Sequence, residues 1–153
     1  MIDKMTKIAL TAALYATLTL ALAPISYGNI QFRLSEVLTL LAFYNPVFIP
    51  GITLGTFIAN LFSPLGTVDV IFGTLATFLS VVMISRTRNF YLATLWPTLF
   101  NGVIIGWELN LVFGLPLMLS MFQVAAGEFV VVSLLGTLIF KKTLKNHRWL
   151  REQ

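Results

Sequence analysis

Uncharged apolar segments of about 20 residues account for most of this sequence, and they restrict what it can fold into. Hydrophobic residues make up 58% of the chain and charged residues only 10%, whereas a soluble domain carries roughly 25% charged residues. A bilayer-crossing helix needs about 20 mostly apolar residues. The 153 residues therefore leave room for one all-α membrane domain of five or six helices, and no room for a soluble catalytic domain.

The lysines and arginines lie in three short clusters and not along one face. These clusters are Lys4 with Lys7, Arg86 with Arg88, and a C-terminal group that begins at Lys141. Cytoplasmic ends and loops of membrane proteins carry such an excess of basic residues. A specific contact with anionic lipid or with a cytoplasmic partner is the alternative interpretation. The net charge of +4 comes from these clusters, and their placement indicates the orientation of the chain in a bilayer and not nucleic-acid binding.

The apolar run 37–62 decides the topology, because Asn45, Pro46 and Pro50 lie in its middle. Proline removes a backbone hydrogen bond and clashes with the preceding helical turn. If the run is one helix, the chain has five spans and its basic tail lies outside the cell, against the positive-inside rule. If the chain turns at Asn45 to Ile49, six spans result, and Arg33 is the single basic residue outside. We predict six spans with both termini in the cytoplasm.

The expected second helix is short. Residues 34–44 would rise only ~16 Å against a hydrocarbon core of ~30 Å, so this helix must start earlier, tilt, or be shielded by its neighbours. Thr67 or Asp69 is expected to cap the fourth helix, and residues 110–114 are expected to form an outer turn. The predicted helices are residues 8–23, 31–44, 47–62, 68–85, 90–108 and 116–140.

The acidic residues gather toward the outer side and the middle of the predicted bundle. Glu36, Asp69 and Glu108 lie near outer helix ends, and Glu128 lies about halfway along the last helix, after the small residues AAG. Ionisable residues at membrane depth are costly and usually face a cavity or a partner. Glu128 either faces a ligand, pairs with Arg33 or another polar residue, or couples protons. We expect an outward-open pocket that prefers a neutral hydrogen-bonding or cationic ligand.

Other polar residues have two interpretations each. Asn101 and Glu108 are seven residues apart and share one helix face, where they contact a ligand or form interhelical hydrogen bonds. Arg33 and Glu36 are three residues apart and either contact the ligand or pair with each other. Asp69 either caps a helix or contacts the ligand, and capping is the preferred interpretation.

Aromatic and small residues give further candidates. Trp107 and Tyr27 lie near the expected outer interface, where aromatic residues anchor helices, although stacking on a flat ligand is the alternative. In the first helix, Ala9, Ala13 and Ala16, with Ala12 between them, give two small-xxx-small spacings. Such a face packs within the bundle or docks on a separate membrane subunit.

Residues for catalysis are scarce. The one histidine, His147, lies in the basic tail, and the chain has no cysteine, HExxH, GxSxG or phosphate loop. We predict that the chain is not an enzyme and holds no metal or cofactor of its own. A process driven by ATP would need its nucleotide-binding machinery from another chain.

Three blocks of the sequence carry a family resemblance. They are YGNIQFRLSEVLTLLAFYNPVFIPGITLGTFIAN, PLGTVDVIFGTLAT and VAAGEFVV. Together they resemble the QueT family, whose members are regarded as substrate-binding S components of energy-coupling factor (ECF) transporters for queuosine precursors. The resemblance extends from about Ala9 to Phe140, and IQFRLSE and LGTVDVIFG are its most specific parts.

The resemblance implies an S component with six transmembrane helices in the bacterial plasma membrane. It would capture a 7-deazaguanine such as preQ1, preQ0 or queuine outside the cell. A transmembrane coupling subunit (EcfT-like) and two cytoplasmic ATPases (EcfA-like), which use ATP and Mg²⁺, would complete the transporter. In S components generally, the alanine motif of the first helix docks on the coupling subunit, and Ala9, Ala13 and Ala16 match it.

The candidate substrate-binding residues suit the chemistry of a deazaguanine. A carboxylate accepts its adjacent N–H donors, and Asn or Arg donates to its ring carbonyl, while a cationic amine needs a second carboxylate. Four alternative functions remain: an S component for a different vitamin, a solitary small-molecule carrier, a membrane scaffold subunit and an intramembrane enzyme. The candidates are Glu128, Asn101, Glu108, Arg33, Glu36, Trp107 and Tyr27.

Overall fold

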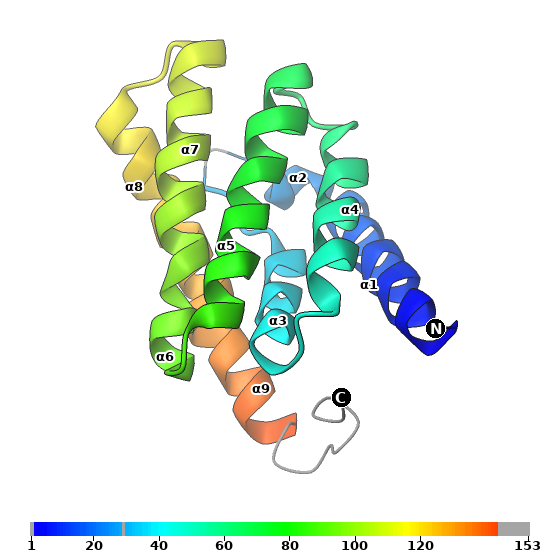
Figure 1. Ribbon diagram of the computed structural model, residues 1–153. Coiled ribbons are helices and arrows are strands. Elements are labelled where there is room, and N and C mark those ends of the chain that lie inside the picture. The colour runs from blue at the N-terminus through cyan, green and yellow to red at the C-terminus, as the bar shows by residue number, and fades with distance from the viewer. Residues whose placement is uncertain (1, 29, 144–153) are drawn as a thin grey trace.

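The computed structural model describes residues 2–28 and 30–143, and every regular element within these ranges is helical. The helices lie side by side in one bundle (Figure 1). This confirms the all-α prediction for that part of the chain. Asn29, His147 and the basic residues from Lys145 onward lie outside the described residues, so the predictions that concern them are not tested.

Short 3-10 and π segments extend several α-helices into longer rods. The 3-10 segment η1 runs into α3, the π segment η2 runs into α5, and the π segment η3 joins α8 to α9. In chain order the elements are α1 (Ile2–Ala21), α2 (Ala23–Ser26), η1 (Leu34–Leu40), α3 (Leu41–Tyr44), α4 (Phe48–Asn60), η2 (Asp69–Gly73), α5 (Thr74–Arg86), α6 (Phe90–Ala93), α7 (Leu95–Phe113), α8 (Leu117–Glu128), η3 (Phe129–Gly136) and α9 (Thr137–Thr143).

Three of these rods are long and apolar enough to cross a membrane, as judged from the described residues. They span Asp69–Arg86, Phe90–Phe113 and Leu117–Phe140, and Leu34–Tyr44 and Phe48–Asn60 are shorter apolar helices. A length of 18 or more apolar residues is what a bilayer core requires. These helices support a membrane location, while the number of spans and their orientation stay predictions.

The apolar run 37–62 is broken into two antiparallel helices. Helix α3 ends at Tyr44, and Asn45 adopts an extended conformation with φ −153° and ψ 119°. The Asn45 side-chain oxygen accepts a hydrogen bond from the Val47 backbone N–H at 2.9 Å. The chain reverses direction there before α4 begins (Figure 1). The turn predicted at Asn45 to Ile49 is therefore present, and it is shorter than predicted because α4 begins at Phe48.

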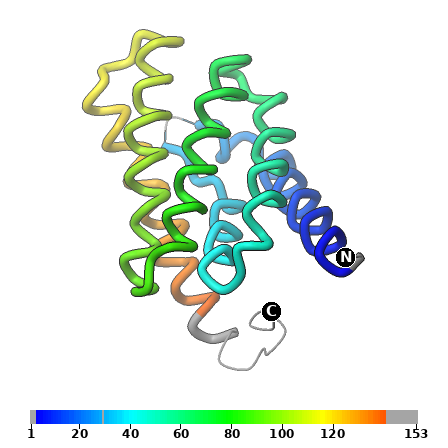
Figure 2. The backbone as a smooth tube through the Cα atoms, in the orientation of Figure 1, coloured from blue at the N-terminus to red at the C-terminus, as the bar shows by residue number. Residues whose placement is uncertain are grey.

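The second rod is shielded by its neighbours. It begins at Leu34, later than the predicted residue 31, and its first part is a 3-10 helix. At about 2.0 Å per residue in the 3-10 part and 1.5 Å in α3, the rod spans roughly 20 Å. It passes through the middle of the bundle among α1, α4, α5 and η3 (Figure 2). Leu40 and Ala42 are fully buried, so neighbouring helices cover this short segment.

The first and fifth helices also have other bounds than predicted. The first helix covers Ile2–Ala21 and not residues 8–23, because Lys7 pairs with Asp3 one turn earlier at 3.1 Å and extends the helix. The fifth helix continues to Phe113, so the turn predicted at residues 110–114 is wrong. The helix ends at Gly114, whose φ of 66° suits a C-terminal cap.

Glycines let the helices approach closely. A Cβ atom added at Gly55 would lie 2.7 Å from the Ala12 carbonyl oxygen, so α4 packs backbone to backbone on α1. A Cβ atom at Gly106 would lie 2.5 Å from the Met121 Cα atom, which brings α7 equally close to α8. Small residues are favoured at such crossings in membrane bundles. The close packing fixes how the polar side chains of these helices meet.

Candidate ligand-binding site

Six polar side chains lie buried together inside the bundle, and we call them the polar cluster. Arg33 precedes η1, Glu36 lies in η1, Asp69 begins η2, and α7 and α8 supply the others. Each of the six is at most 3% exposed. Charged side chains are almost never fully buried unless they are paired. The polar cluster consists of Arg33, Glu36, Asp69, Asn101, Glu108 and Glu128.

Arg33 is the cation of the polar cluster. Its guanidinium lies 3.8 Å from a carboxylate oxygen of Asp69, and its Cζ atom lies 5.4 Å from the centre of the Tyr27 ring. Thus Asp69, and not Glu36, is its ion-pair partner within 4 Å. The capping interpretation of Asp69 is wrong, because η2 begins after Val68 with no side-chain cap. The attraction of Arg33 turns the Asp69 carboxylate into the bundle.

Glu36 is held by two hydroxyl groups that sequence analysis did not single out. Tyr15 of α1 and Thr77 of α5 both donate to the same Glu36 carboxylate oxygen, the latter at 3.1 Å. All three side chains are fully buried. The signal for Tyr15 was a tyrosine within the uncharged stretch 8–23, since a buried Tyr O–H usually needs a partner. Thr77 gave no comparable signal.

Helix α7 reaches two ends of the polar cluster. The Asn101 side chain is within interaction range of both Glu36 and Glu128. Glu108, two turns further along, faces Asp69 and Arg33 instead. The shared face predicted for Asn101 and Glu108 is therefore buried, and it points into the cluster. Both groups are placed to hydrogen-bond either a ligand or a neighbouring helix.

The loop before η1 lies directly against α8. A Cβ atom at Gly127 would come 2.5 Å from the Gln31 backbone oxygen, so only glycine permits this approach. The contact brings the loop that carries Arg33 next to Glu128, the following residue of α8. Gln31 is itself 1% exposed. The space beside the small residues before Glu128 is therefore filled by the backbone of the loop at Gln31.

Many polar atoms of the cluster have no hydrogen-bond partner in the described structure. They include both oxygens of Glu108 and of Asp69, one oxygen each of Glu36 and Glu128, and two nitrogens of Arg33. Leaving a buried polar group unpaired costs about 1–3 kcal/mol, and more for a charged group. Four carboxyl groups around one guanidinium give an excess of acceptors. The arrangement suits a ligand that brings N–H donors or a cation.

The four carboxyl groups do not form a metal centre. Among residues 2–28 and 30–143, no three His, Cys, Asp or Glu side chains come close enough to hold a metal ion. The carboxyl groups are instead spread along the cluster, with Asp69 and Glu108 at one end and Glu36 and Glu128 at the other. This spacing suits an organic ligand with several polar edges.

The two aromatic candidates lie in different places. Tyr27 borders the cluster, since its ring faces Arg33 and its hydroxyl donates to the Ala59 carbonyl at 2.6 Å. Trp107 is 38% exposed and packs edge-on against Phe72, with ring centres 5.2 Å apart. Trp107 therefore lies at the surface of the bundle, while Glu108 beside it points inward.

The alanines of α1 are divided between two faces. Ala9 and Ala13 are exposed, beside the exposed Leu10 and Leu14. Ala16 is 7% exposed and Ala12 is 4% exposed, on the side that packs within the bundle. The spacing Ala9–Ala13 is thus available to another subunit. Ala16 is not part of that surface.

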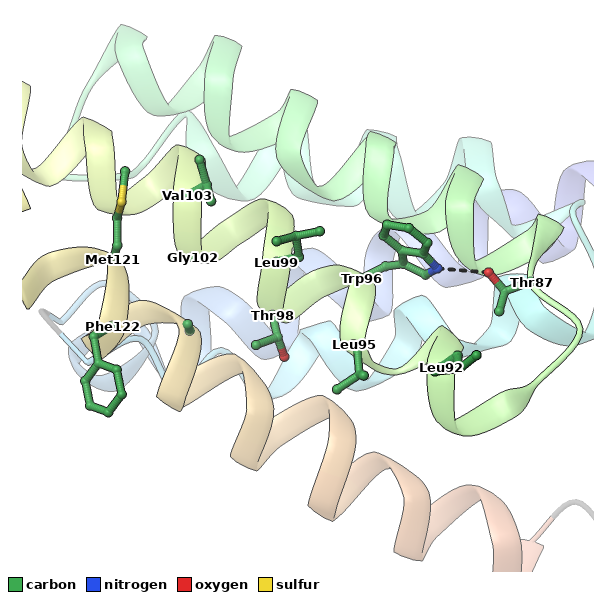
Figure 3. Close-up of a pocket in the computed structure, with 11 residues that line it drawn as sticks. Thr87, Leu92, Leu95, Trp96, Thr98, Leu99, Gly102, Val103, Met121 and Phe122 are labelled. Carbon is green, nitrogen blue, oxygen red and sulfur yellow. Dashed lines mark hydrogen bonds between the residues drawn. The ribbon is translucent and has the colours of Figure 1, made fainter. Parts of the chain in front are cut away.

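A large hollow in the described structure is separate from the polar cluster. It is a groove of about 700 Å³ between α7 and α8, and its lining is almost entirely apolar (Figure 3). None of the six residues of the polar cluster lines it. A polar ligand needs convergent hydrogen-bonding groups, so the polar cluster and not this groove is the candidate ligand site.

Comparisons with known proteins place this chain in a family. The family model described as QueT transporter matches residues 5–145. The queuosine precursor transporter QueT of Lactococcus lactis subsp. cremoris (strain MG1363) is 36% identical over 151 residues, which cover 88% of each chain. No solved structure matches this chain. On the family match and this identity, the chain belongs to the QueT transporter family.

Proposed function

We propose that this chain is the membrane-embedded S component of an ECF transporter and binds a queuosine precursor from outside the cell. Membership of the QueT transporter family and the similarity to the queuosine precursor transporter of Lactococcus lactis support the substrate class. The apolar helices support a place in the membrane. The bundle would cross the bilayer six times with both ends in the cytoplasm of a bacterium.

The polar cluster is the observation that carries the substrate proposal. A 7-deazaguanine presents adjacent N–H donors on its guanine-like edge and a ring carbonyl beside them. A buried carboxylate accepts two such donors together, and charge-assisted bonds of this kind are the stronger ones. Glu128 is the proposed acceptor, because one of its oxygens is buried without a partner. Asn101, within range of Glu128, is the proposed donor to the carbonyl.

The opposite end of the cluster suits a cationic substituent. Glu108 has two buried oxygens without partners in the described structure, and it faces Asp69, which Arg33 approaches to 3.8 Å. The aminomethyl group of preQ1 is a cation and would bind there, whereas preQ0 carries a neutral nitrile. Tyr27 offers its ring beside Arg33 as a flat apolar wall. We therefore propose that preQ1 binds more tightly than preQ0.

Uptake would require partners that this chain does not contain. The proposed docking surface is the exposed face of α1 around Ala9 and Ala13, flanked by Leu10 and Leu14. Small residues four apart let another helix approach closely. The proposed partner is an EcfT-like coupling subunit that carries two EcfA-like ATPases. Those ATPases would bind and hydrolyse ATP with Mg²⁺.

Titration of the purified protein tests the substrate. Calorimetry with preQ1, preQ0, queuine and a panel of vitamins should show tight binding of a deazaguanine only. Glu128→Gln should weaken that binding by roughly 30-fold or more, because truncating a buried charge partner costs about 2–5 kcal/mol. Asp3→Asn is the matched control, since Asp3 is 63% exposed and far along α1 from the cluster.

Three outcomes would contradict the proposal. Tight binding of a vitamin in place of a deazaguanine would indicate an S component for another substrate. Unchanged affinity in Glu128→Gln would remove Glu128 from the site. Uptake into vesicles that contain this chain alone would indicate a solitary carrier and exclude the need for ATPases.

A further inference from the structure

The groove between α7 and α8 has the shape of a site for a hydrocarbon chain. Its volume of about 700 Å³ falls in the range of small-molecule sites. Leu99 and Phe122, 52% and 72% exposed, form its two sides (Figure 3). A Cβ atom at Gly102 would lie 2.9 Å from the Ala125 Cβ atom, so the helix crossing forms its floor. In a membrane, this surface faces acyl chains.

One end of the groove is polar and carries positive charge. Thr87 lines the groove there, and the Trp96 indole N–H donates to its hydroxyl at 2.8 Å (Figure 3). Arg86 and Arg88 flank Thr87, and both are exposed. Basic residues next to a membrane surface attract anionic lipid headgroups. Tryptophan with a hydrogen-bonded N–H is typical of the interface where headgroups and acyl chains meet.

A second polar atom lies midway along the groove, with Leu92 and Leu95 between it and Thr87 (Figure 3). The hydroxyl oxygen of Thr98 is buried and has no hydrogen-bond partner in the described structure. Thr98 lines the groove and projects toward α8 (Figure 3). A buried hydroxyl without a partner costs free energy. An ester carbonyl, which in a phospholipid lies just below the headgroup, would accept its hydrogen bond.

We propose that this groove binds an anionic phospholipid of the bilayer. One acyl chain lies between Leu99 and Phe122, the ester region meets Thr98, and the phosphate lies at Arg86 and Arg88. Cations at one end, a hydroxyl midway along the groove and apolar side chains beyond it would meet the phosphate, the ester region and the acyl chain of such a lipid. This lipid site is independent of the deazaguanine site, because it shares no residue with the polar cluster.

Native mass spectrometry of the purified full chain tests the headgroup preference. The protein is incubated with phosphatidylglycerol or phosphatidylcholine of the same acyl chains, and the retained lipid is counted. Phosphatidylglycerol should be retained preferentially, and Arg88→Gln should weaken its retention roughly fivefold. Lys4→Gln is the control for charge, because Lys4 is an exposed lysine on α1 and does not line the groove.

A second pair of variants tests the place of the acyl chain. Leu99→Trp should fill the groove and reduce retention of the lipid, whereas Leu75→Trp on the exposed face of α5 should not. Both substitutions are at exposed positions, so the fold tolerates them. Equal retention of the two lipids, equal effects of Arg88→Gln and Lys4→Gln, or equal effects of the two tryptophans would overturn the proposal. Crosslinking of a coupling subunit at position 99 would do so as well.

Discussion

Replacing Tyr15 with phenylalanine tests the contact on which the centre of the bundle depends. The Tyr15 hydroxyl and the Thr77 hydroxyl donate to the same oxygen of Glu36, and the other Glu36 oxygen has no partner. Tyr15→Phe removes one donor and keeps the ring in place. Because Tyr15 is fully buried, no solvent can replace the lost bond directly.

The expected loss follows from the chemistry of this contact. A hydrogen bond to a charged group contributes about 1.5–3 kcal/mol, and a second donor remains on the same oxygen. We therefore expect Tyr15→Phe to lower the free energy of unfolding by about 1.5–3 kcal/mol. For a chain of this size the loss corresponds to a decrease in Tm of roughly 3–12 °C. Thr77→Val removes the other donor, which lies 3.1 Å from the same Glu36 oxygen, and should also lower the free energy of unfolding.

Unfolding in detergent, followed by tryptophan fluorescence, measures this loss. Thr11→Val is the matched control, since the buried Thr11 hydroxyl donates only to the Lys7 carbonyl within its own helix. If Tyr15→Phe lowers the unfolding free energy no more than Thr11→Val does, the Tyr15–Glu36 contact does not stabilise the bundle. The double variant Tyr15→Phe with Thr77→Val should lose more than the sum of the single variants, because Glu36 then keeps neither donor.

Three further predictions concern packing, charge and docking. Gly106→Val should destabilise the bundle by about 1–3 kcal/mol by separating α7 from α8, whereas Val103→Ile on the exposed side should change thermal unfolding little. Arg33→Met should cost about 3–5 kcal/mol in chemical unfolding, because Asp69 is left buried without its ion-pair partner; a much smaller loss when Asp69→Asn is also present would show that this pair is responsible. Ala13→Trp should abolish co-purification with a coupling subunit and spare ligand binding, and a loss of both would indicate a packing role instead.

The helical fold was predictable because its determinants are local. Asn45 and Pro46 stop a helix whatever surrounds them, and the structure turns there. The end of α7 was misplaced, because Asn110 resembles a turn residue. In the structure the Asn110 side chain donates to the Leu115 carbonyl at 2.6 Å and supports the cap at Gly114. Identifying the correct cap required the backbone angle of that glycine.

The candidate site was predictable only in part, because its contacts join distant segments. The cost of burying charge singled out Arg33 and Glu128, and periodicity placed Asn101 and Glu108 on one face. The spacing of residues along a helix does not show which residue of another helix a charged side chain pairs with. Asp69 therefore looked like a helix cap, although it pairs with Arg33, 36 positions earlier in the sequence.

The division of α1 into two faces could not be read from alanine spacing. Ala9–Ala13 and Ala12–Ala16 have the same spacing, yet one pair is exposed and the other is buried. The distinction depends on Gly55, which lets α4 approach the Ala12 side of the helix. Spacing identifies a small-residue face, but only the neighbouring helix decides which face is covered.

Helix α1 also connects the buried polar cluster to the exposed helix face around Ala13. Tyr15 holds Glu36 from one side of this helix, and Ala13, half a turn away, is open to a neighbour on the other. Because a helix moves as a stiff rod, a tilt imposed at the exposed alanines would pull on the carboxyl group at the centre. We therefore expect ligand binding in the polar cluster and docking of a coupling subunit on α1 to influence each other through the Tyr15 hydroxyl.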